Sequence, residues 1–391
     1  MRILRVIPTM DPAMGGPCQG IRNSIPELEK LGVQNEVVCL DQANAGFLES
    51  DTFPIHFVGR AVGPWWYHKA LVPWLLTNFS RFDIVIVHGL WLYPSYAVWK
   101  IIKSFKANHE SKSIPKVYVM PHGMLDPWFQ RAHGRKFKAV RNKIYWKLLE
   151  ANVVNDADGL LFTCEEELKL AREAFSPYKP KKELNVGYGI LPPPSYIADM
   201  DRAFKYACPG IDNKSYLLFL SRIDVKKGVD LLIQAYLALK KEGYKLPALV
   251  IAGPGEKSSY GLKVIKIASK DDGILFPGML KGDAKWGAFY GCEAFVLPSH
   301  QENFGIAVVE ALACGKPALI SNRVNIWREI KDGKSGLIDT DTLYGVKQLI
   351  LKWINLSQDK RVEMEQSAKK LFQKKFNISL SAKKLLEVLK A

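Results

Sequence analysis

Short apolar runs rich in Val, Ile and Leu alternate along the chain with longer stretches of helical periodicity. Buried strands of parallel sheets are nearly continuous apolar runs, and the connections between them are usually helices. The runs fall into two series. They lie at residues 3–7, 36–40, 83–87, 116–120 and 159–162, and then at 216–220, 248–252, 274–276, 294–297 and 318–320. The pattern predicts an α/β protein with two doubly wound parallel sheets.

A run of prolines separates the two series, at Leu191-Pro192-Pro193-Pro194-Ser195. Successive prolines exclude a helix and make a stiff, extended connection. A chain of 391 residues also exceeds the roughly 100 to 200 residues of one usual domain. We therefore predict an N-terminal domain at 1–191 and a C-terminal domain at 192–370, with a cleft between the carboxyl ends of both sheets. Helices are expected at 229–241 and 306–314, and the pattern is wholly helical after about residue 340.

Composition narrows the class of protein. With 48% hydrophobic and 24% charged residues, the chain is typical of globular proteins. The start, MRILRVIPTM, is broken by Pro8 and lacks the apolar core of a signal peptide. The longest uncharged stretch, 84–99, is shorter than the roughly 20 residues of a membrane-spanning helix. Six scattered cysteines form no C-x-x-C pair. These features together predict a cytoplasmic protein.

The net charge of +16 suits three kinds of partner: nucleic acid, an anionic membrane or an anionic small molecule. No helix-turn-helix, zinc or RNA-binding signature is present, so no nucleic-acid partner is expected. One local concentration, with no acidic residue between 127 and 149, contains Trp128, Phe129, Phe137 and Tyr145 among Arg131, Arg135, Lys136, Lys138, Arg141, Lys143 and Lys147. This stretch suits anionic lipid headgroups, an anionic acceptor or a solvated helix with aromatic side chains in the core.

Two loops have the composition of phosphate-binding turns. Met14-Gly15-Gly16-Pro17 follows the first predicted strand, and its backbone amides suit either an anion or a tight turn with Pro17 starting a helix. At the head of the second series, Arg222 leaves a strand and Lys227-Gly228 precedes a helix. A guanidinium fork and an ammonium charge would together neutralise a diphosphate without metal. The alternative for this second loop is a solvated basic turn.

The segment 299–311 contains the strongest local signal, because a helix begins near Gly305 directly after a predicted strand. Free amides at its start suit an anionic or hydroxyl-rich group. The carboxylates of Glu302 and Glu310 can accept hydrogen bonds from sugar and ribose hydroxyls. Charge complementarity at a helix start explains Glu302 equally simply, and a solvated helix face explains Glu310.

Two histidines end predicted strands of the first series, His88 and His122. A neutral imidazole at His122 would hydrogen-bond a donor hydroxyl or steady a reaction centre, although structural histidines are common at strand ends. For His88 a packing role or a place in the cleft wall is favoured. Three Asp-x-Asp pairs, at 156/158, 199/201 and 339/341, follow no strand at the predicted cleft, so no metal site is predicted.

The ordered combination of these motifs resembles glycosyltransferase family 4, whose members are retaining enzymes of the GT-B fold. The resemblance covers nearly the whole chain and is specific only in combination. Its motifs are Gly15-Gly16, Pro121-His122-Gly123-Met124-Leu125, Ser221-Arg222 with Lys227-Gly228, Gly253-Pro254-Gly255, and Glu302-x7-Glu310 before Gly315-Lys316-Pro317. Many relatives have Gly where Ser221 stands, a mild departure. The resemblance implies two Rossmann-like domains facing a central cleft, with a helix within 371–391 crossing back to the first domain.

Site residues follow from the same resemblance. Arg222 and Lys227 would hold the diphosphate of a sugar donor, with Gly16 closing over it. His122 and Glu302 would be the catalytic residues. The full implied donor site comprises Gly16, Arg222, Lys227, Met279, Glu302, Asn303, Phe304, Gly305, Ile306 and Glu310. Within it, Glu302 and the backbone of 303–306 would hold the sugar, Glu310 the ribose and the backbone of Met279 the base.

The resemblance implies a hexosyltransferase that moves a hexose-type sugar from a nucleotide-diphosphate sugar, UDP-sugar favoured, without metal or another cofactor. Its acceptor would be a glycan or lipid-linked glycan of cell-envelope or exopolysaccharide biosynthesis, reached at the inner face of the plasma membrane. No pair of carboxylates accompanies the His122 segment to support double displacement. The alternative is a nucleotide-sugar epimerase of the same fold. The sequence leaves base, sugar, acceptor, linkage and oligomeric state open.

Overall fold

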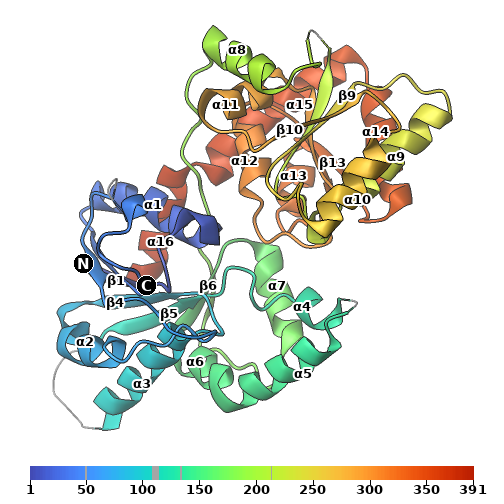
Figure 1. Cartoon of the computed structure of the whole chain (residues 1–391). Coiled ribbons are helices and arrows are strands. Elements are labelled where there is room, and N and C mark those ends of the chain that lie inside the picture. The colour runs from blue at the N-terminus through green and yellow to red at the C-terminus, as the bar shows by residue number, and fades with distance from the viewer. Residues whose placement is uncertain (49–50, 108–113, 133, 213) are drawn as a thin grey trace. The chain divides into compact units, whose positions relative to one another are not determined.

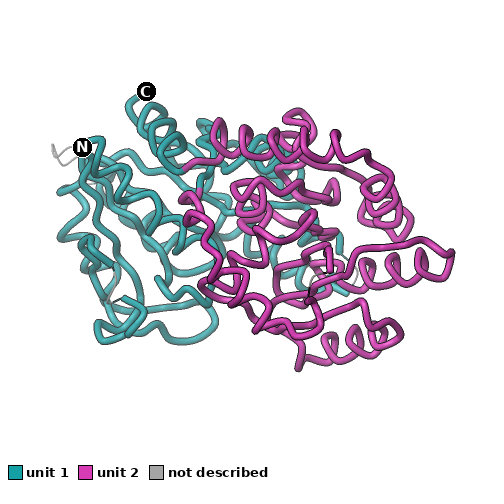
Figure 2. Tube along the Cα trace, turned by 90° about the horizontal axis from the view of Figure 1, so that it is seen from above, with its two compact units in different colours: residues 1–189, 378–391 teal, residues 190–377 magenta. Residues whose placement is uncertain are grey.

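The structure is a computed structural model that describes residues 1–48, 51–107, 114–132, 134–212 and 214–391. The chain divides into two compact units, which Figures 1 and 2 show. Unit 1 comprises Met1–Gly189 together with Ile378–Ala391, and unit 2 comprises Ile190–Asn377. Within the described ranges, no helix is both long and apolar enough to cross a membrane.

Unit 1 is built on a seven-stranded sheet in which every adjacent pair of strands is parallel, with the order β3-β2-β1-β4-β5-β6-β7. Its strands are β1 Arg2–Val6, β2 Gln34–Cys39, β3 Ile55–Phe57, β4 Ile84–His88, β5 Lys116–Met120, β6 Gly159–Phe162 and β7 Glu183–Asn185. The strand order reverses between β1 and β4. Ligands of doubly wound sheets bind outside the carboxyl ends of the strands at such a point.

Helices of unit 1 cover this sheet, and the last helix of the chain is one of them. They are α1 Gly16–Glu29, α2 Leu71–Asn78, α3 Tyr93–Ala107, α4 Trp128–Arg131, α5 Lys136–Tyr145, α6 Ala151–Asp156, α7 Glu165–Ala174 and α16 Ile378–Lys390. Buried Leu385 and Leu386 of α16 share a core with Ile3 of β1 and Leu28 of α1. Apolar burial thereby holds the C-terminal segment in unit 1.

Unit 2 has a parallel sheet of six strands in the order β10-β9-β8-β11-β12-β13. The strands are β8 Tyr216–Leu220, β9 Ala248–Ala252, β10 Ile274–Gly278, β11 Ala294–Leu297, β12 Ala318–Ser321 and β13 Gly336–Asp339. The main helices are α8 Ala198–Ala207, α9 Val229–Lys241, α10 Ser259–Ala268, α11 Gly282–Gly291, α12 Ile306–Ala313, α13 Trp327–Asp332, α14 Leu343–Ile354 and α15 Gln358–Leu371. The predicted pair of doubly wound parallel sheets is confirmed.

Three short edge strands are not predicted from the sequence: β3, β7 and β13. Each is only three or four residues long and only partly buried, so none produces the continuous apolar run of a central strand. One prediction was wrong as a result. Asp339 is the last residue of β13, so the Asp339/Asp341 pair does follow a strand. Lys352 contacts Asp339, and His300 and Arg323 contact Asp341.

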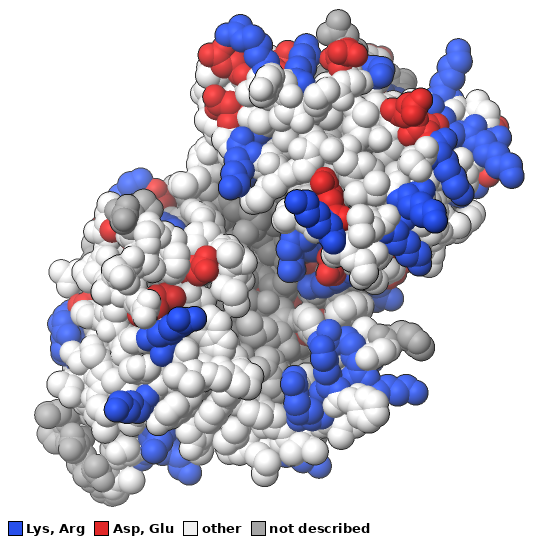
Figure 3. All heavy atoms as spheres, in the orientation of Figure 1, with Lys and Arg blue, Asp and Glu red and all other residues white. Residues whose placement is uncertain are grey.

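The basic stretch between 124 and 149 is not one continuous helix, because α4 ends at Arg131 and α5 begins at Lys136. Trp146 is buried, whereas Phe137 is 94% exposed. In Figure 3, blue spheres of Lys and Arg gather over the part of unit 1 where Figure 1 places α4 and α5. The alternative of a solvated helix with its aromatic side chains in the core therefore fails for Phe137, while Trp128, Phe129 and Tyr145 are partly buried.

Candidate functional site

In unit 2 the strand order reverses between β8 and β11, and the loops that follow these two strands carry residues 222–228 and 299–305. The loops touch each other. The backbone amide of His300 donates to the carbonyl of Lys226 at 2.8 Å. Gly228 has a left-handed backbone (φ 68°), and a Cβ there would lie 2.3 Å from the carbonyl oxygen of Pro298. Only glycine permits this approach, which brings the lysines of one loop to the acidic residue of the other.

Lys227 and Glu302 form an ion pair across these loops. Both side chains are largely buried, with exposures of 9% and 18%. Burial pushes the pKa of Glu302 upward, but the charges of Lys227, Lys226 and Arg222 outweigh burial and hold it below its usual range. Glu302 is therefore ionised at neutral pH, and its oxygens act only as acceptors. Arg222, in contrast, is exposed.

The start of α12 lies directly beyond Glu302. Gly305 caps the helix in a left-handed conformation (φ 75°), and its carbonyl accepts from the amides of Val308 and Val309. The amides of Ile306 and Ala307, at the very start of the helix, have no intrahelical acceptor. Phe304 is buried and packs edge-on against Phe376, with ring centroids 5.7 Å apart, so its side chain belongs to the core. Phe304 can therefore contribute only its backbone to a ligand. The amides near Asn303, Gly305 and Ile306 have the character that suits a polar ligand.

Glu310 occupies the second turn of the same helix and is held by a residue that the sequence motifs do not include. Lys285 of α11 donates to Glu310 Oε1 at 2.6 Å, and its ammonium lies 4.5 Å from the ring centroid of Trp286. Burial raises the pKa of Glu310, and Lys285 opposes this rise. No local motif marks Lys285, because the pair spans 25 positions and is formed only by packing. Met279, directly after β10, is 60% exposed.

In unit 1, the predicted histidine is one of a pair. His88 Nδ1 and His122 Nε2 are 3.0 Å apart, and the two rings are nearly parallel. Burial lowers the pKa of His122 to about 3, with a further contribution from the charge of Arg5. The pKa of His88 is also lowered well below its usual value, by burial, then by His122 and Arg5. Both imidazoles are thus neutral at pH 7, and His88 packs against His122.

The residue following β5 is held in an unusual backbone conformation. His122 has φ 52°, a region that bulky residues rarely adopt. Glu167 of α7 accepts from the amide of the neighbouring Gly123 at 2.5 Å and from the amide of Thr163 at 2.7 Å. This buried carboxylate therefore stabilises the turn that carries His122.

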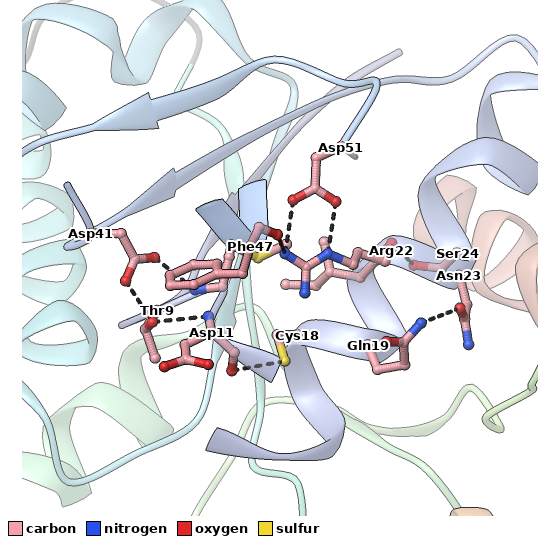
Figure 4. Close-up of polar contacts among 12 residues, drawn as sticks. Thr9, Asp11, Cys18, Gln19, Arg22, Asn23, Ser24, Asp41, Phe47 and Asp51 are labelled. Atoms are coloured by element: carbon pink, nitrogen blue, oxygen red, sulfur yellow. Dashed lines mark hydrogen bonds and ion pairs between the residues drawn. The ribbon is translucent and has the colours of Figure 1, made fainter. Parts of the chain in front are cut away.

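The loop between β1 and α1 carries Gly16 and is fixed by a network of side chains (Figure 4). Asp41 accepts from the hydroxyl of Thr9 at 2.6 Å and from the amide of Met10 at 2.7 Å. Arg22 of α1 forms two bonds to Asp51, at 2.7 and 2.8 Å. The carbonyl of Gly16 itself accepts from the hydroxyl of Tyr188 at 2.9 Å. The backbone around Gly16 is thereby positioned by polar contacts from several elements.

The predicted site residues therefore form one group in each unit. In unit 2, Lys227, Glu302 and the start of α12 lie together, with Glu310 further along that helix. In unit 1, the structure joins His122 to His88 and Arg5, two residues to which the sequence assigns no chemical role. The carboxyl ends of β1, β4 and β5 bring them together, and no local sequence signal marks that contact.

Comparison with known proteins agrees with this geometry. Residues 205–371 match the model of glycosyl transferases group 1, and residues 15–182 match the glycosyl transferase 4-like domain. The chain belongs to the glycosyltransferases of the family 4 type. Both family matches exclude 378–391, the helix that returns to unit 1.

Solved structures share the fold of this family 4 chain. The Anabaena protein HepE, in complex with UDP and glucose, is 17% identical with a TM-score of 0.74, over 100% of this chain and 99% of that one. Sucrose-phosphate synthase from Thermosynechococcus elongatus is 16% identical with a TM-score of 0.72, over 100% and 98%. At such identities the likeness establishes the GT-B fold.

Curated relatives are similar over shorter segments. The D-inositol 3-phosphate glycosyltransferase of Arthrobacter sp. (strain FB24) is 30% identical over 128 residues, which cover 32% of this chain and 30% of the relative. A GDP-mannose-dependent alpha-(1-6)-phosphatidylinositol monomannoside mannosyltransferase of Mycolicibacterium smegmatis is 22% identical over 267 residues. The similar segment covers 63% of this chain and 68% of the relative. This chain thus spans about a third of the length of curated relatives such as the Arthrobacter protein.

Proposed function

We propose that this chain is a retaining glycosyltransferase that moves a hexose-type sugar from a nucleotide-diphosphate sugar to a glycan or lipid-linked glycan. The observation that carries the proposal is the arrangement at the strand reversal of unit 2. There a buried lysine holds a buried carboxylate beside the open amides of α12. Cations and helix-start amides suit a diphosphate, and ionised carboxylates suit the hydroxyls of the attached sugar and ribose.

Each residue then has one role. Arg222 and Lys227 hold the diphosphate and neutralise the charge that develops on it, so that the site needs no metal. Glu302 and the amides at the start of α12 hold the sugar, Glu310 holds the ribose, and the backbone at Met279 meets the base. In unit 1, Gly16 offers its backbone to the diphosphate, and His122 hydrogen-bonds near the reacting carbon.

The proposed reaction keeps the new bond on the face that the nucleotide leaves. The bond between the sugar C1 and the diphosphate oxygen breaks, and the acceptor oxygen forms a bond to C1. The acceptor's proton passes to the departing phosphate oxygen, so atoms and charge balance without a protein nucleophile. The protein contributes mainly positioning and charge stabilisation. Neutral His122 suits a hydrogen bond in this step because it adds no positive charge.

UDP-sugar is the donor we favour, and cell-envelope or exopolysaccharide synthesis is the setting. HepE is described in complexes with UDP and with UDP-glucose. A Salmonella typhimurium relative, 28% identical over 189 residues, is named lipopolysaccharide 1,2-N-acetylglucosaminetransferase. The mannosyltransferase relative is named for GDP-mannose, so the base needs a direct experiment.

Thermal shift of the full chain with UDP-, GDP- and ADP-sugars tests the donor. A bound donor raises the melting temperature, and we expect the largest rise with a UDP-sugar. Variants Arg222→Met and Glu310→Ala should lose that rise, while Lys281→Met, an exposed cation outside the proposed site, should retain it. Incubation of the donor without acceptor separates transferase from epimerase, because an epimerase converts the sugar without an acceptor. No shift with any nucleotide sugar would refute the proposal.

We also propose that unit 1 contacts an anionic membrane at the cytoplasmic face through α5 and the turn after it. Phe137, Val140, Ile144 and Leu148 recur every three or four residues and are 94%, 59%, 56% and 68% exposed. This spacing places them on one helical face, opposite buried Ala139 and Trp146. The exposed cations of this segment are Lys136, Lys138, Arg141, Lys143 and Lys147. An apolar face bordered by cations suits the interface of an anionic bilayer.

Sedimentation with vesicles tests this contact. The full chain should sediment with vesicles of anionic phospholipid and much less with neutral vesicles. Phe137→Ser combined with Leu148→Ser should abolish most of the binding, whereas Leu76→Ser, at an exposed leucine of α2, should not. Equal recovery of the wild-type chain from anionic and neutral vesicles would contradict the proposal.

A further inference from the structure

A small hollow in unit 1 lies behind the histidine pair. It is lined by Arg5 of β1, His88 of β4, His122, Tyr188 and Ser381 of α16, together with apolar groups. Its volume is about 40 Å³. A cavity needs roughly 10 to 15 Å³ to hold one water molecule, so the hollow admits a few small atoms and no sugar or nucleotide. None of the described residues that line it is acidic.

Arg5 gives the hollow an uncompensated positive charge. Its side chain is almost fully buried, at 2% exposure, and its Nε donates to Asn35 Oδ1 at 3.3 Å. Among the described protein groups, Arg5 Nη2 has no acceptor within hydrogen-bond distance. Burial lowers the pKa of Arg5 only to about 10, so the guanidinium stays charged at neutral pH. A buried cation without a counter-charge is costly, and natural proteins rarely leave one unpaired.

A second buried polar atom belongs to a residue that lines the same hollow. His88 uses Nδ1 for its contact with His122, and its buried Nε2 has no hydrogen-bond partner in the described part of the chain. Neighbouring hydroxyls already donate elsewhere. Tyr188 donates to the carbonyl of Gly16 at 2.9 Å, and Ser381 donates to the carbonyl of Ile378 at 3.0 Å. Arg5 and His88 are therefore the two groups left to recognise whatever occupies the hollow.

We propose that this hollow is a binding site for a small monovalent anion of halide size, held by Arg5 Nη2–H and His88 Nε2–H. The anion supplies the counter-charge that no lining side chain provides, and it accepts hydrogen bonds from both orphan groups at once. The size of the hollow excludes phosphate esters and carboxylate-bearing sugars. The site lies among side chains of unit 1 alone and is distinct from the proposed donor residues of unit 2.

An anion in this position also determines which histidine nitrogens carry hydrogen. Because an anion only accepts, His88 must carry its hydrogen on Nε2, and its Nδ1 must then accept from His122 Nε2–H. His122 is thereby left with an unprotonated Nδ1, which can accept a hydrogen bond from a sugar hydroxyl. Water could instead donate to His88 Nε2 and reverse both tautomers. This consequence for His122 rests on the proposed function, but the anion site itself does not.

Diffraction from crystals of the full wild-type chain grown or soaked in sodium bromide tests the site. Bromide scatters anomalously, and we expect an anomalous peak in contact with both Arg5 Nη2 and His88 Nε2. A hollow that shows only water at high bromide concentration would overturn the proposal. The experiment needs no variant and no sugar donor, so it decides the question even if the proposed enzymatic function fails.

Melting temperature provides the solution test. At constant ionic strength, replacing sodium gluconate by sodium chloride should raise the melting temperature of the wild-type chain saturably, because the anion binds only the folded state. Arg5→Met should abolish this dependence. Arg2→Met, on the same strand but partly exposed and paired with Glu36, should retain it. Indistinguishable melting curves of the wild-type chain in the two salts would contradict the proposal.

Discussion

The two units balance charge in opposite ways at equivalent places, the carboxyl edges of their parallel sheets. Unit 2 pairs two largely buried carboxylates with lysines, Glu302 with Lys227 and Glu310 with Lys285. Unit 1 places buried Arg5 beside two imidazoles, with no acidic side chain among the described residues around the hollow. The two sites therefore differ: unit 2 has two pairs of opposite charges, whereas the hollow of unit 1 has a single cation beside neutral groups.

This difference shows what each edge can offer a ligand. Charges from lysine and arginine hold Glu302 ionised against the effect of burial, so unit 2 presents both signs of charge within one loop pair. A donor with an anionic diphosphate and neutral hydroxyls can replace these internal partners one for one. In unit 1, burial and Arg5 keep His122 neutral, so its imidazole can take part in a hydrogen bond without adding a positive charge.

Among the substitutions that test this difference between the units, we expect Lys227→Met to lower sugar transfer the most. It removes a cation from the proposed diphosphate site and leaves Glu302 largely buried without its partner. We expect kcat/KM to fall on the order of 10² to 10³, as when one preorganised electrostatic contact is lost. The rate of sugar transfer at a saturating acceptor concentration measures this kcat/KM. Lys226→Met, next to it, should cost much less.

A double variant separates the ion pair from the chemistry. Glu302→Gln added to Lys227→Met removes the unpaired buried charge, so it should restore much of the melting temperature lost in the single variant. Transfer should stay low, because neither the cation nor the carboxylate is present. Full transfer in Lys227→Met would remove this lysine from the site.

The sequence predicts the central strands well because burial on both faces produces apolar runs, as in 216–220 and 248–252. It misses β3, β7 and β13, which are short and half-buried at the sheet edges. The sequence also marks Lys227, Glu302 and Gly305 as candidates, because they lie in short loops directly after predicted strands. The pairing of Lys227 with Glu302 could not be found, since it requires the contact between two loops 75 positions apart.

Residues with no local signal were missed for the same reason. Arg5 lies within the strand Arg-Ile-Leu-Arg-Val, and only the folded sheet shows that it is buried. Lys285 is one of many lysines, and the packing of α11 beside α12 gives it a partner. Long-range contacts, rather than residue types, determine these two roles. The sequence therefore predicted the ligand-facing motifs and not the groups that set their charge.

His122→Asn should have the second largest effect, because it keeps a polar side chain but removes the titrating ring. We expect transfer to fall about ten- to a hundredfold, below the usual range for loss of a general acid or base, since the proposed role is one hydrogen bond. The same variant tests the neutral state. The folded pKa of about 3 lies below the ordinary value of 6.5, so the unfolded chain binds the proton more readily. Wild-type stability from this group is complete above pH 6.5 and is lost as pH falls toward 3.

Urea unfolding at pH 7.5 and pH 5.0 measures this contribution. The wild-type midpoint should drop between the two pH values by more than that of His122→Asn. His300 has the opposite effect on the pH dependence of stability, because a hydrogen bond to Asp341 raises its pKa. This effect is present in both proteins and cancels when their midpoints are compared. Equal drops in the two proteins would show that His122 is already protonated in the folded state, and the contrast between the units would fail.

Lys285→Met should have the smallest effect and should appear as pH dependence. Burial already raises the pKa of Glu310, and loss of Lys285 removes the charge that opposes the rise. As pH falls, Glu310 should then take up a proton at a higher pH than in the wild-type chain and cease to accept from the proposed ribose diol. Donor KM should rise with falling pH, by about tenfold for each pH step of one below the pKa of Glu310, with kcat nearly unchanged. Glu310→Gln, which cannot titrate, should show a raised donor KM without this dependence, and Lys281→Met, an exposed cation at the start of the same helix as Lys285, should behave as wild type. A flat profile in Lys285→Met would mean that Glu310 stays ionised without its lysine, and the matched charges of unit 2 would then be incidental to donor binding.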